Sequence, residues 1–480
     1  MQKPIRTLVS AAVVALMANA THAGSFSLYT ESNGVSVGNF GAGIAAEAAD
    51  ASTGWYNPAG LALIREQQIS FGGVGVFPTA KISGTSTFST VGLPPYIQSF
   101  SNLDGGKDGF VPSLHYALPL GDAATFGLSV VAPFGLKTLW GEASPVRYAA
   151  TLSELKTFNI SPEIGGRITD HFALGAGIDF QYSQVKFNRM LGSPTLLGFY
   201  SAFGVPVTPN YLDSESYNKG DSFGVGFHAG AMGLFNEEHT RIGLNYQSQV
   251  RHKFHGFSRL NGRLATPGLD VTDPLSVLFA DPNALQRVDI LSSNNIDFPD
   301  IVTLSAYQDV NERLALLGSV VWTGWSSLST IQLNNAVAYA PPSATFAGGQ
   351  VLVNSVSVED YRDTWRFALG ANYWWNDQLM LRVGGGYDQT PTRDAFRSIR
   401  IPDANRWALS IGGHYQVRPN IGIDAGYTHL FSADDPSINR TDAVGSTSSY
   451  TINATTKAHA DLVGAQITWI IDQPVPVPTK

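Results

Sequence analysis

A strict alternation of apolar and polar side chains constrains this chain more than any other feature. From Trp407 to Val417 every second residue is apolar, aromatic or glycine, and polar or small residues stand between them. The same pattern recurs at 174–183, 241–247 and 381–388. Successive side chains of a β-strand point to opposite faces, so this period of two predicts strands with one apolar face.

The composition favours strands that face lipid. Charged residues make up 14% of the chain, against about 25% in ordinary globular proteins. Aromatic residues such as Trp365, Tyr387 and Trp469 cluster near the expected strand ends, as in the aromatic girdles of membrane barrels. A soluble β-sandwich also alternates, but the strands are too numerous for one sandwich and no linker divides them. The sequence therefore predicts an all-β, transmembrane antiparallel β-barrel.

Counting the alternating segments gives about 14 strands, an even number that suits a bacterial barrel of one chain. They are expected near 66–77, 109–118, 124–141, 145–169, 172–190, 221–236, 240–257, 296–310, 313–335, 362–376, 378–390, 403–417, 420–433 and 458–471. Short and long connections alternate between them. The long ones are expected at 78–108, 191–220, 258–295, 336–361, 391–402 and 434–457. Short turns belong on the periplasmic side and long loops outside.

The first 23 residues have the features of a secretory signal peptide. Lys3 and Arg6 precede an apolar stretch from Leu8 to Met17, which is too short to span a bilayer as a helix. Cleavage after Ala20 and cleavage after Ala23 both remain open. Removing the two cations takes the net charge from −8 to −10, which argues against nucleic acid as a partner. The chain has no cysteine, so disulfides and thiolate chemistry are excluded.

Residues 24–65 do not alternate and precede the expected barrel, which covers 66–471. They end in Asn57-Pro58-Ala59-Gly60, where Asn57 can cap a helix and Pro58 suits its first position. A disordered periplasmic tail is one interpretation. Apolar residues such as Phe26 and Trp55 favour a folded plug in the lumen instead, because a disordered tail would lack them.

Eight short segments together form a specific pattern through their order and spacing: 24–26, 38–43, 57–60, 111–116, 132–136, 362–366, 388–391 and 401–407. In these segments the chain resembles the FadL/TodX group of outer-membrane transporters of long-chain fatty acids and other hydrophobic compounds, and the resemblance covers nearly all of it. Its first part is similar to the family's N-terminal hatch with an Asn-Pro-Ala motif. One departure is the tail 472–480, which follows Trp469 where family members usually end on an aromatic residue.

The resemblance implies a hatch inside the barrel and a third wall strand whose break opens sideways. The sequence supports a break at Pro133, Phe134 and Gly135, because proline cannot donate to the ladder and glycine weakens it. Unpaired backbone groups are unfavourable in lipid, so such a break is tolerated where it lines a cavity. A harmless bulge is the other interpretation.

Ligand-binding residues are expected in two long loops and on the wall. Exposed apolar clusters often mark binding surfaces, although these loops could equally pack together as a lid. The apolar candidates are Leu196, Leu197, Phe199, Phe203, Leu278 and Phe279. Arg147 and Lys156, expected on the fourth strand, could meet a carboxylate or form salt bridges in the lumen.

These features predict uptake of long-chain fatty acids or other hydrophobic small molecules by a monomer in the outer membrane of a Gram-negative bacterium. The expected partners are the hydrophobic ligand and membrane lipid, and no cofactor or metal is expected. Transport of aromatic hydrocarbons is the closest alternative, followed by a general porin or a structural barrel. An enzyme is not expected: Ser113 and His115 lie two apart on one strand, roughly 7 Å between Cα atoms, too far for a nucleophile–base pair.

Overall fold

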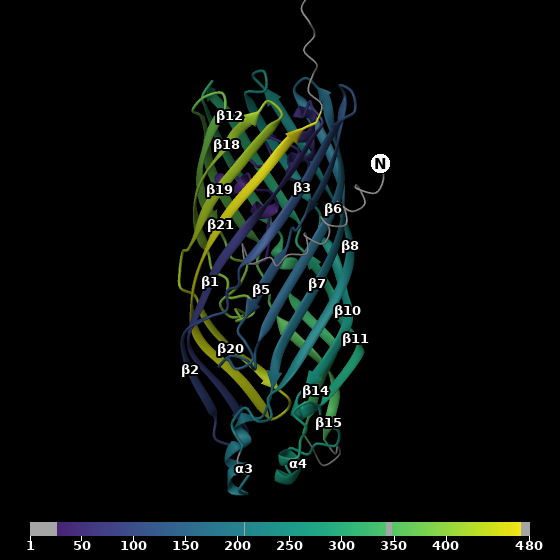
Figure 1. Cartoon of the computed structure of the whole chain (residues 1–480), viewed down its shortest axis with the longest axis vertical. Coiled ribbons are helices and arrows are strands. Elements are labelled where there is room, and N and C mark those ends of the chain that lie inside the picture. Colours follow the sequence, from purple (N-terminus) through teal and green to yellow (C-terminus); the bar gives the residue numbers. More distant parts are fainter. Residues whose placement is uncertain (1–25, 206, 342–347, 472–480) are drawn as a thin grey trace, which may run out of the picture.

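The wall of the molecule is one antiparallel sheet that closes on itself (Figure 1). The computed structural model describes residues 26–205, 207–341 and 348–471. The first strand pairs along its whole length with the last, from Gln68 opposite Ile470 to Thr90 opposite Ser448. The sheet therefore closes on itself through the pairing of its first and last strands. The expected signal peptide (1–23) and tail (472–480) lie outside the described residues.

Seven wall strands are interrupted once, so 21 segments form a closed barrel of 14 strands. This confirms the predicted fold. In chain order the strands are β1 (Gln68–Thr90), β2 (Tyr96–Asp104) with β3 (Gly109–Pro119), β4 (Ala124–Val131) with β5 (Gly135–Leu139), β6 (Leu152–Thr169), β7 (Phe172–Leu191), β8 (Ser214–Phe235), β9 (Thr240–Gln247) with β10 (Val250–Asn261), β11 (Leu285–Phe298) with β12 (Ile301–Asn311), β13 (Leu314–Thr323) with β14 (Thr330–Ala340), β15 (Gly349–Val358) with β16 (Thr364–Trp374), β17 (Leu379–Asp388), β18 (Arg406–Arg418), β19 (Ile421–Ser432) with β20 (Ser437–Val444), and β21 (Ser448–Ile470).

The two ends of the barrel differ. At the upper end in Figure 1 the strands are joined by short turns such as 120–123, 170–171 and 419–420, and we call this the turn end. The opposite, loop end carries the strand extensions and the helices η4 (Pro194–Leu196), α3 (Leu197–Ala202), η5 (Arg263–Ala265) and α4 (Pro274–Leu278). Short turns belong on the periplasmic side, so the loop end faces outward from the cell.

Several segments that were expected to be loops are strands. The range 78–108 contains the end of β1 and all of β2, and 336–361 and 434–457 contain β15 and β20. On these extensions exposed side chains are polar as well, for example Ser99 and Ser101 on β2. Beyond the lipid both faces of the wall meet water, so the apolar–polar period disappears although the strand continues.

The outward face of the wall is apolar and the inward face is polar. On β7 the side chains of Phe172, Leu174, Ile178 and Phe180 are between 40% and 50% exposed. The intervening Asp179 faces inward and is buried. Outward apolar side chains thus cover about ten residues of the strand, the length needed to cross the hydrocarbon core at a tilt. No helix in the described ranges is long and apolar enough to cross a membrane.

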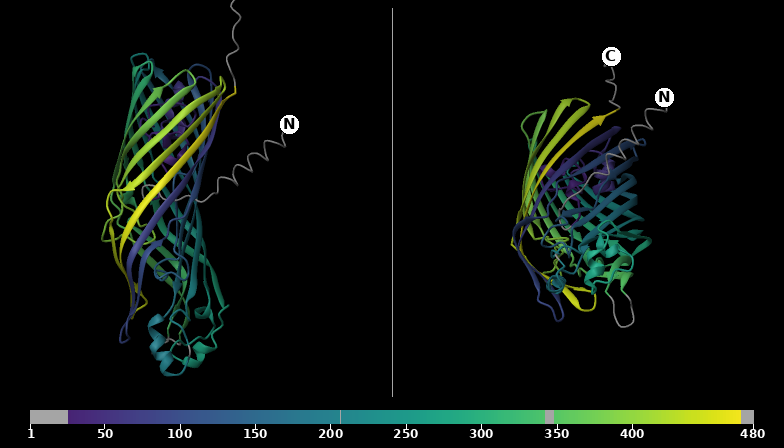
Figure 2. Two further views of the ribbon diagram at one scale, coloured as in Figure 1. Left: turned by 60° about the vertical axis from the view of Figure 1, so that its left-hand side comes forward. Right: turned by 60° about the horizontal axis from the view of Figure 1, so that its bottom comes forward.

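Residues 26–67 lie inside the barrel, in the half that carries the turn end (Figure 2). They form η1 (Thr30–Ser32), η2 (Ser36–Gly38), α2 (Thr53–Tyr56) and η3 (Pro58–Leu63), and we call them the lumen segment. Helix η3 packs against β6, β7 and β8, whereas η2 packs against β18 and β19. A further turn, η6 (Trp325–Ser327), lies between β13 and β14.

Candidate functional site

The turn at Asn57 attaches the lumen segment to the wall. The Asn57 side chain accepts a hydrogen bond from the amide of Ala59 at 3.1 Å, which caps η3. Its amide nitrogen donates to the carbonyl of Ala45 at 2.7 Å and to the carbonyl of Ala231 on β8 at 3.1 Å. Asn57 is fully buried, so one side chain orders the turn and joins it to the barrel.

Three glycines of the wall receive this turn. Gly165, Gly175 and Gly230 stand directly opposite one another on β6, β7 and β8. A Cβ atom on Gly165 would lie 1.8 Å from the carbonyl oxygen of Pro58, and one on Gly175 would lie 2.3 Å from its carbonyl carbon. The lumen segment therefore packs backbone against backbone, and side chains at these positions would push it away.

A second glycine contact lies on the other side of the lumen. Gly412 and Gly426 face each other on β18 and β19. A Cβ atom on Gly412 would lie 2.6 Å from the Cα of Gly38, and one on Gly426 would lie 2.5 Å from its nitrogen. The lumen segment is thus held between two parts of the wall that fit its backbone closely.

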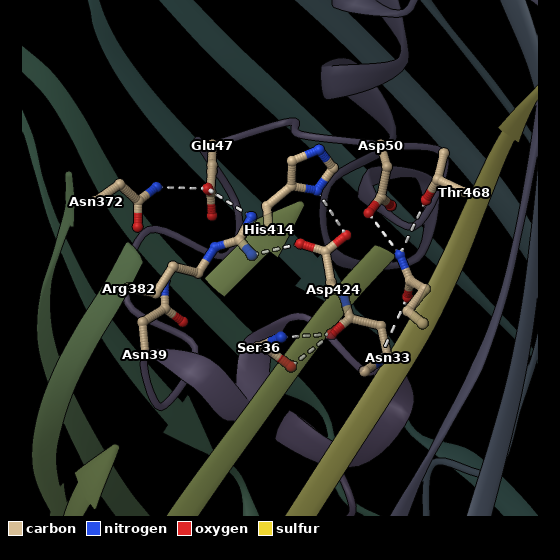
Figure 3. A network of polar contacts seen from close by, with 12 residues as sticks. Asn33, Ser36, Asn39, Glu47, Asp50, Asn372, Arg382, His414, Asp424 and Thr468 are labelled. Carbon is tan, nitrogen blue, oxygen red and sulfur yellow. Dashed lines mark hydrogen bonds and ion pairs between the residues drawn. The ribbon is translucent and has the colours of Figure 1, made fainter. Parts of the chain in front are cut away.

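Polar contacts near the turn end reinforce this attachment (Figure 3). Glu47 accepts a hydrogen bond from Asn372 at 2.8 Å and lies 3.9 Å from a guanidinium nitrogen of Arg382. Arg382 also forms an ion pair with Asp424 on β19. Asp50 accepts from the side-chain amide of Gln466 on β21 at 2.7 Å. Glu47 and Asp50 belong to the lumen segment, so these bonds join it to β16, β17 and β21.

The third wall strand is interrupted where the sequence predicts it. β4 ends at Val131 and β5 begins at Gly135, so residues 132–134 leave the ladder. The register between β3 and β4 ends at Leu114 opposite Val130, and the next bridge joins Gly106 to Thr138. Residues 107–113 and 131–137 therefore face each other without ladder pairs, and this is the wall break.

The start of the lumen segment fills the wall break from inside. The amide of Leu28 donates to the carbonyl of Pro133 at 2.8 Å, and the amide of Gly135 donates to the carbonyl of Phe26 at 2.8 Å. Phe134 donates its amide to the Thr157 hydroxyl at 2.9 Å. The carbonyl of Pro133 and the amides of Phe134 and Gly135 thus find partners in the lumen and on β6.

Phe26 anchors this contact in an apolar cluster. Its ring centroid lies 4.6 Å from that of Trp325, 5.9 Å from that of Phe298 and 6.0 Å from that of Phe134. We call the surrounding residues the inner cluster: Phe26, Phe134, Leu136, Leu155, Val185, Phe254, Ile296, Phe298, Trp325, Leu328, Tyr361 and Ile401. Withdrawal of Phe26 would leave apolar space directly behind the wall break.

A narrow pocket continues the inner cluster toward the loop end. Its lining includes Val185, Phe187, Phe254 and Leu291, and its volume is about 10 Å³. This is space for about one water, so the pocket is closed in this conformation. A ligand of several carbons needs a rearrangement before it can enter.

Two cations border this pocket, and sequence reasoning missed both. The Arg400 guanidinium lies 5.6 Å from the centre of the Phe187 ring and donates to the Ser153 hydroxyl at 3.0 Å. Arg189 follows Phe187 by two residues on β7 and shares its inward face. In the described residues neither guanidinium has a carboxylate within 4 Å. Burial and the nearby charge of Arg189 lower the pKa of Arg400 to about 10.

The predicted cations occupy other places. Arg147 precedes β6, which begins at Leu152 rather than at 145. Its guanidinium is bound to Asp213 at 2.6 Å and to Gln98 at 2.9 Å, so it is already neutralised. Lys156 lies on the outward face of β6 and contacts Glu154 at 3.3 Å. Neither side chain is placed to meet a ligand in the lumen. Lys156 shares the face of Phe158 and Ile160, which is the outward face of β6.

The predicted apolar loop residues form two groups. Leu196 and Phe199 pack with Tyr200, Leu264 and Val271, so the two long loops cover each other at the loop end. The residues left at the surface are Phe203, Leu278 and Phe279, which are 64%, 41% and 80% exposed, while Leu197 is half-buried on α3. The loops thus form a lid with an apolar outer surface.

Ser113 and His115 do not form a nucleophile–base pair. Both ring nitrogens of His115 contact other groups. Nδ1 lies 2.9 Å from the Ser129 hydroxyl, and Nε2 lies 3.1 Å from the carbonyl oxygen of Ser32. His115 is a contact between the wall and the lumen segment.

Comparison with known proteins places this arrangement in a family. The family model described as "Outer membrane protein transport protein (OMPP1/FadL/TodX)" matches residues 14–470. The chain belongs to this family. The family consists of transport proteins of the outer membrane, and the barrel described here is an outer-membrane barrel.

Relatives of this FadL/TodX-family barrel match it over most of their length. A long-chain fatty acid transport protein of Escherichia coli O6:H1 is 28% identical over 443 residues, which cover 89% of this chain and 92% of the relative. The outer membrane protein P1 of Haemophilus influenzae is 28% identical over 495 residues, covering 98% and 100%.

Solved structures of the family share the fold. A Pseudomonas aeruginosa FadL homologue matches with a TM-score of 0.74 at 24% identity, over 94% of this chain and all of that one. The toluene transporter TbuX of Ralstonia pickettii matches with a TM-score of 0.55 at 17% identity, over 87% and 93%.

Proposed function

We propose that this barrel takes up long-chain fatty acids, and that the ligand leaves the lumen sideways through the wall break. The observation that carries the proposal is the filling of the break by Phe26–Leu28 in front of the inner cluster. A small displacement of this short segment would join an apolar interior to the lipid outside. The relative named as a fatty acid transporter matches nearly the whole chain, which supports the same class of substrate.

In this proposal residues 24–65 are a hatch, held by the Asn57, Pro58, Ala59 and Gly60 turn, and Pro133, Phe134 and Gly135 form the lateral opening. The exposed Phe203, Leu278 and Phe279 receive the ligand at the loop end. Each of these parts is made by the same chain, so the barrel acts as a monomer.

The energetics require such a moving part. Burial of one methylene contributes about 0.8 kcal/mol, so a chain of about fifteen carbons gains on the order of 10 kcal/mol before the opposing terms. A site that held it so tightly would release it slowly. Withdrawal of Phe26 lowers the affinity by removing apolar contacts, and the ligand can then move on without an energy source.

The two unpaired cations favour a carboxylate ligand over a neutral hydrocarbon. Arg189 and Arg400 border the apolar pocket, and a fatty acid would place its carboxylate there and its chain in the inner cluster. A monoaromatic hydrocarbon could fill the same aromatic space around Phe26, and it is the second candidate. Such a ligand would gain nothing from the arginines.

Binding measurements on one double variant separate the two candidates. R189Q/R400Q should weaken binding of a C16 fatty acid about tenfold or more, because a charge-assisted hydrogen bond contributes about 1.5–3 kcal/mol. Binding of the uncharged C16 alkane should stay the same. The matched control is R313Q/R418Q, which removes two exposed cations at the turn end. Equal fatty acid affinity in the wild type and R189Q/R400Q would remove the case for a carboxylate and favour the hydrocarbon.

A further inference from the structure

The lysines of this chain gather on one part of the outer surface. Five of them lie on neighbouring wall segments: Lys137 on β5, Lys156 on β6, Lys186 on β7, Lys219 on β8 and Lys253 on β10. The other lysines in the described ranges, Lys81, Lys107 and Lys457, lie on β1, on the β2–β3 connection and on β21, and all three are exposed. We call the first five the lysine patch.

The strand register places these side chains side by side. Lys137 is opposite Glu154, Glu154 is opposite Lys186, and Lys186 is opposite Lys219. Directly opposite residues share a face of the sheet, about 5 Å apart. On the same faces of β6, β7 and β8 stand Ile160, Phe180 and Phe223, which are 38%, 40% and 62% exposed. The lysine patch therefore faces out of the barrel.

The lysine patch begins where the apolar band ends. On β6, Lys156 precedes Phe158 by two residues. On β7, Lys186 follows Tyr182 by four residues, and on β8, Lys219 precedes Phe223 by four. Each lysine is on the loop-end side of these aromatic residues. This is the level at which the head groups of the outer leaflet meet the barrel.

The five lysines outnumber the carboxylates among them on this face, which are Glu154 on β6 and the exposed Asp221 on β8. Glu154 contacts Lys186 at 2.6 Å and Lys156 at 3.3 Å. In the described residues no ion pair joins Lys137, Lys219 or Lys253 to a carboxylate. Lys186 and Lys219 are directly opposite each other, an arrangement that destabilises a sheet unless an anion is near. Such a patch is unusual on a chain with a net charge of −8.

We propose that the lysine patch binds the phosphates of a phosphorylated lipid in the outer leaflet, whose acyl chains lie along the apolar band below. Lys186 and Lys219 hold one phosphate between them, with Lys137, Lys156 and Lys253 around it. The acyl chains contact Ile160, Phe180 and Phe223. A soluble polyanion would match the charge alone, whereas the adjoining apolar band specifies a lipid. This inference needs the membrane position of the barrel and does not depend on the transported substrate.

The test compares lipid binding by the purified full-length protein and three double variants. K186Q/K219Q removes the opposed lysines, K186R/K219R keeps their charge, and R313Q/R418Q removes two cations at the other end of the barrel. Native mass spectrometry measures the occupancy by lipid A carrying both phosphates and by the same lipid with its phosphates removed. The heat-dependent mobility of each variant on SDS gels reports whether the barrel is folded.

The proposal predicts that K186Q/K219Q lowers the occupancy by phosphorylated lipid about tenfold or more, whereas K186R/K219R and R313Q/R418Q keep it. The dephosphorylated lipid should bind weakly to all four proteins, and 10 mM inorganic phosphate should not displace the phosphorylated one. Three results would overturn it: equal occupancy in K186Q/K219Q and wild type, equal binding of the dephosphorylated lipid, or displacement by free phosphate.

Discussion

At the scale of single residues, Glu31 is the least compensated group of the lumen segment. Its side chain is fully buried, and neither carboxylate oxygen has a hydrogen-bond partner in the described residues. Burial raises the pKa of Glu31 to about 7, although the nearby charges of Arg366 and Arg406 oppose the shift and Asp388 adds to it. A buried acid with such a pKa makes the docking of the lumen segment dependent on pH.

We expect the lumen segment to dock more tightly at pH 5 than at pH 8. A released segment would expose Glu31, whose pKa would return to about 4.5. Docking therefore takes up a proton between pH 4.5 and 7, and its free energy becomes less favourable by about 3 kcal/mol as pH rises through this window. Hydrogen exchange of the η1 and η2 amides, corrected for the intrinsic rate at each pH, measures the effect.

The control for this prediction is Glu31→Gln, which cannot ionise. It should show a smaller difference in protection between pH 5 and pH 8 than the wild type, with protection at pH 8 at or above the wild-type level. Some difference remains, because burial also raises the pKa of Glu47 on the same segment. Wild-type protection that does not change between pH 5 and pH 8 would contradict the prediction.

Residues whose role follows from local backbone chemistry could be recognised from the sequence. Residues whose role depends on the side of the wall that they face could not. Asn57 is a residue type that caps helices, and Pro133 lacks the amide hydrogen that a strand needs. The structure places a helix cap at Asn57 and a strand break at Pro133. Lys156, which the sequence predicts as a lumen cation, lies on the outward face of β6, whereas Arg189 lies on the inward face of β7. The difference between them is the face of the strand, which register and closure decide.

At the scale of elements, the contact between η3 and the wall depends on glycines that no local rule explains. Gly165 and Gly175 weaken their strands, yet they are the positions where the Pro58 turn approaches. Glycines at inward positions of neighbouring strands are the sequence signal that could have located this contact. The strand extensions at the loop end were missed for a different reason, because both of their faces meet water.

We expect Gly175→Val to displace the lumen segment without unfolding the barrel. Its Cβ would lie 2.3 Å from the carbonyl carbon of Pro58, and the backbone there cannot yield without moving η3. The expected result is a folded barrel, shown by heat-dependent mobility, with larger and more frequent conductance in single-channel recordings.

Gly318→Val is the matched control. Gly318 is on β13, and its Cβ would meet the flexible end of Leu369 at 3.2 Å. This variant should conduct like the wild type. A Gly175→Val barrel that stays closed would show that the glycine contact does not hold the segment in place.

At the scale of the whole molecule, the closed sheet and the interior segment depend on each other. The number of strands and the antiparallel order follow from the alternation along the chain, so the barrel could be predicted. The sequence does not predict the contact by which the first residues of the lumen segment replace the missing ladder at the wall break. Phe26 and Pro133 are more than a hundred residues apart, and the contact uses backbone groups.

The lumen segment must leave the wall break for uptake to occur, and a reversible cross-link between the two tests this requirement. Ser27 and Phe134 form an antiparallel bridge flanked by the hydrogen bonds of their neighbours. Cα atoms in such a pair lie about 4.5 Å apart, which suits a disulfide. The chain has no cysteine of its own, so S27C/F134C adds a single possible bond.

The measurement is fatty acid uptake into proteoliposomes that contain S27C/F134C, before and after reduction. We expect no uptake by the oxidised protein, recovery on reduction, and the same ligand binding in both states. Uptake by the oxidised protein at the rate of the reduced one would contradict this requirement.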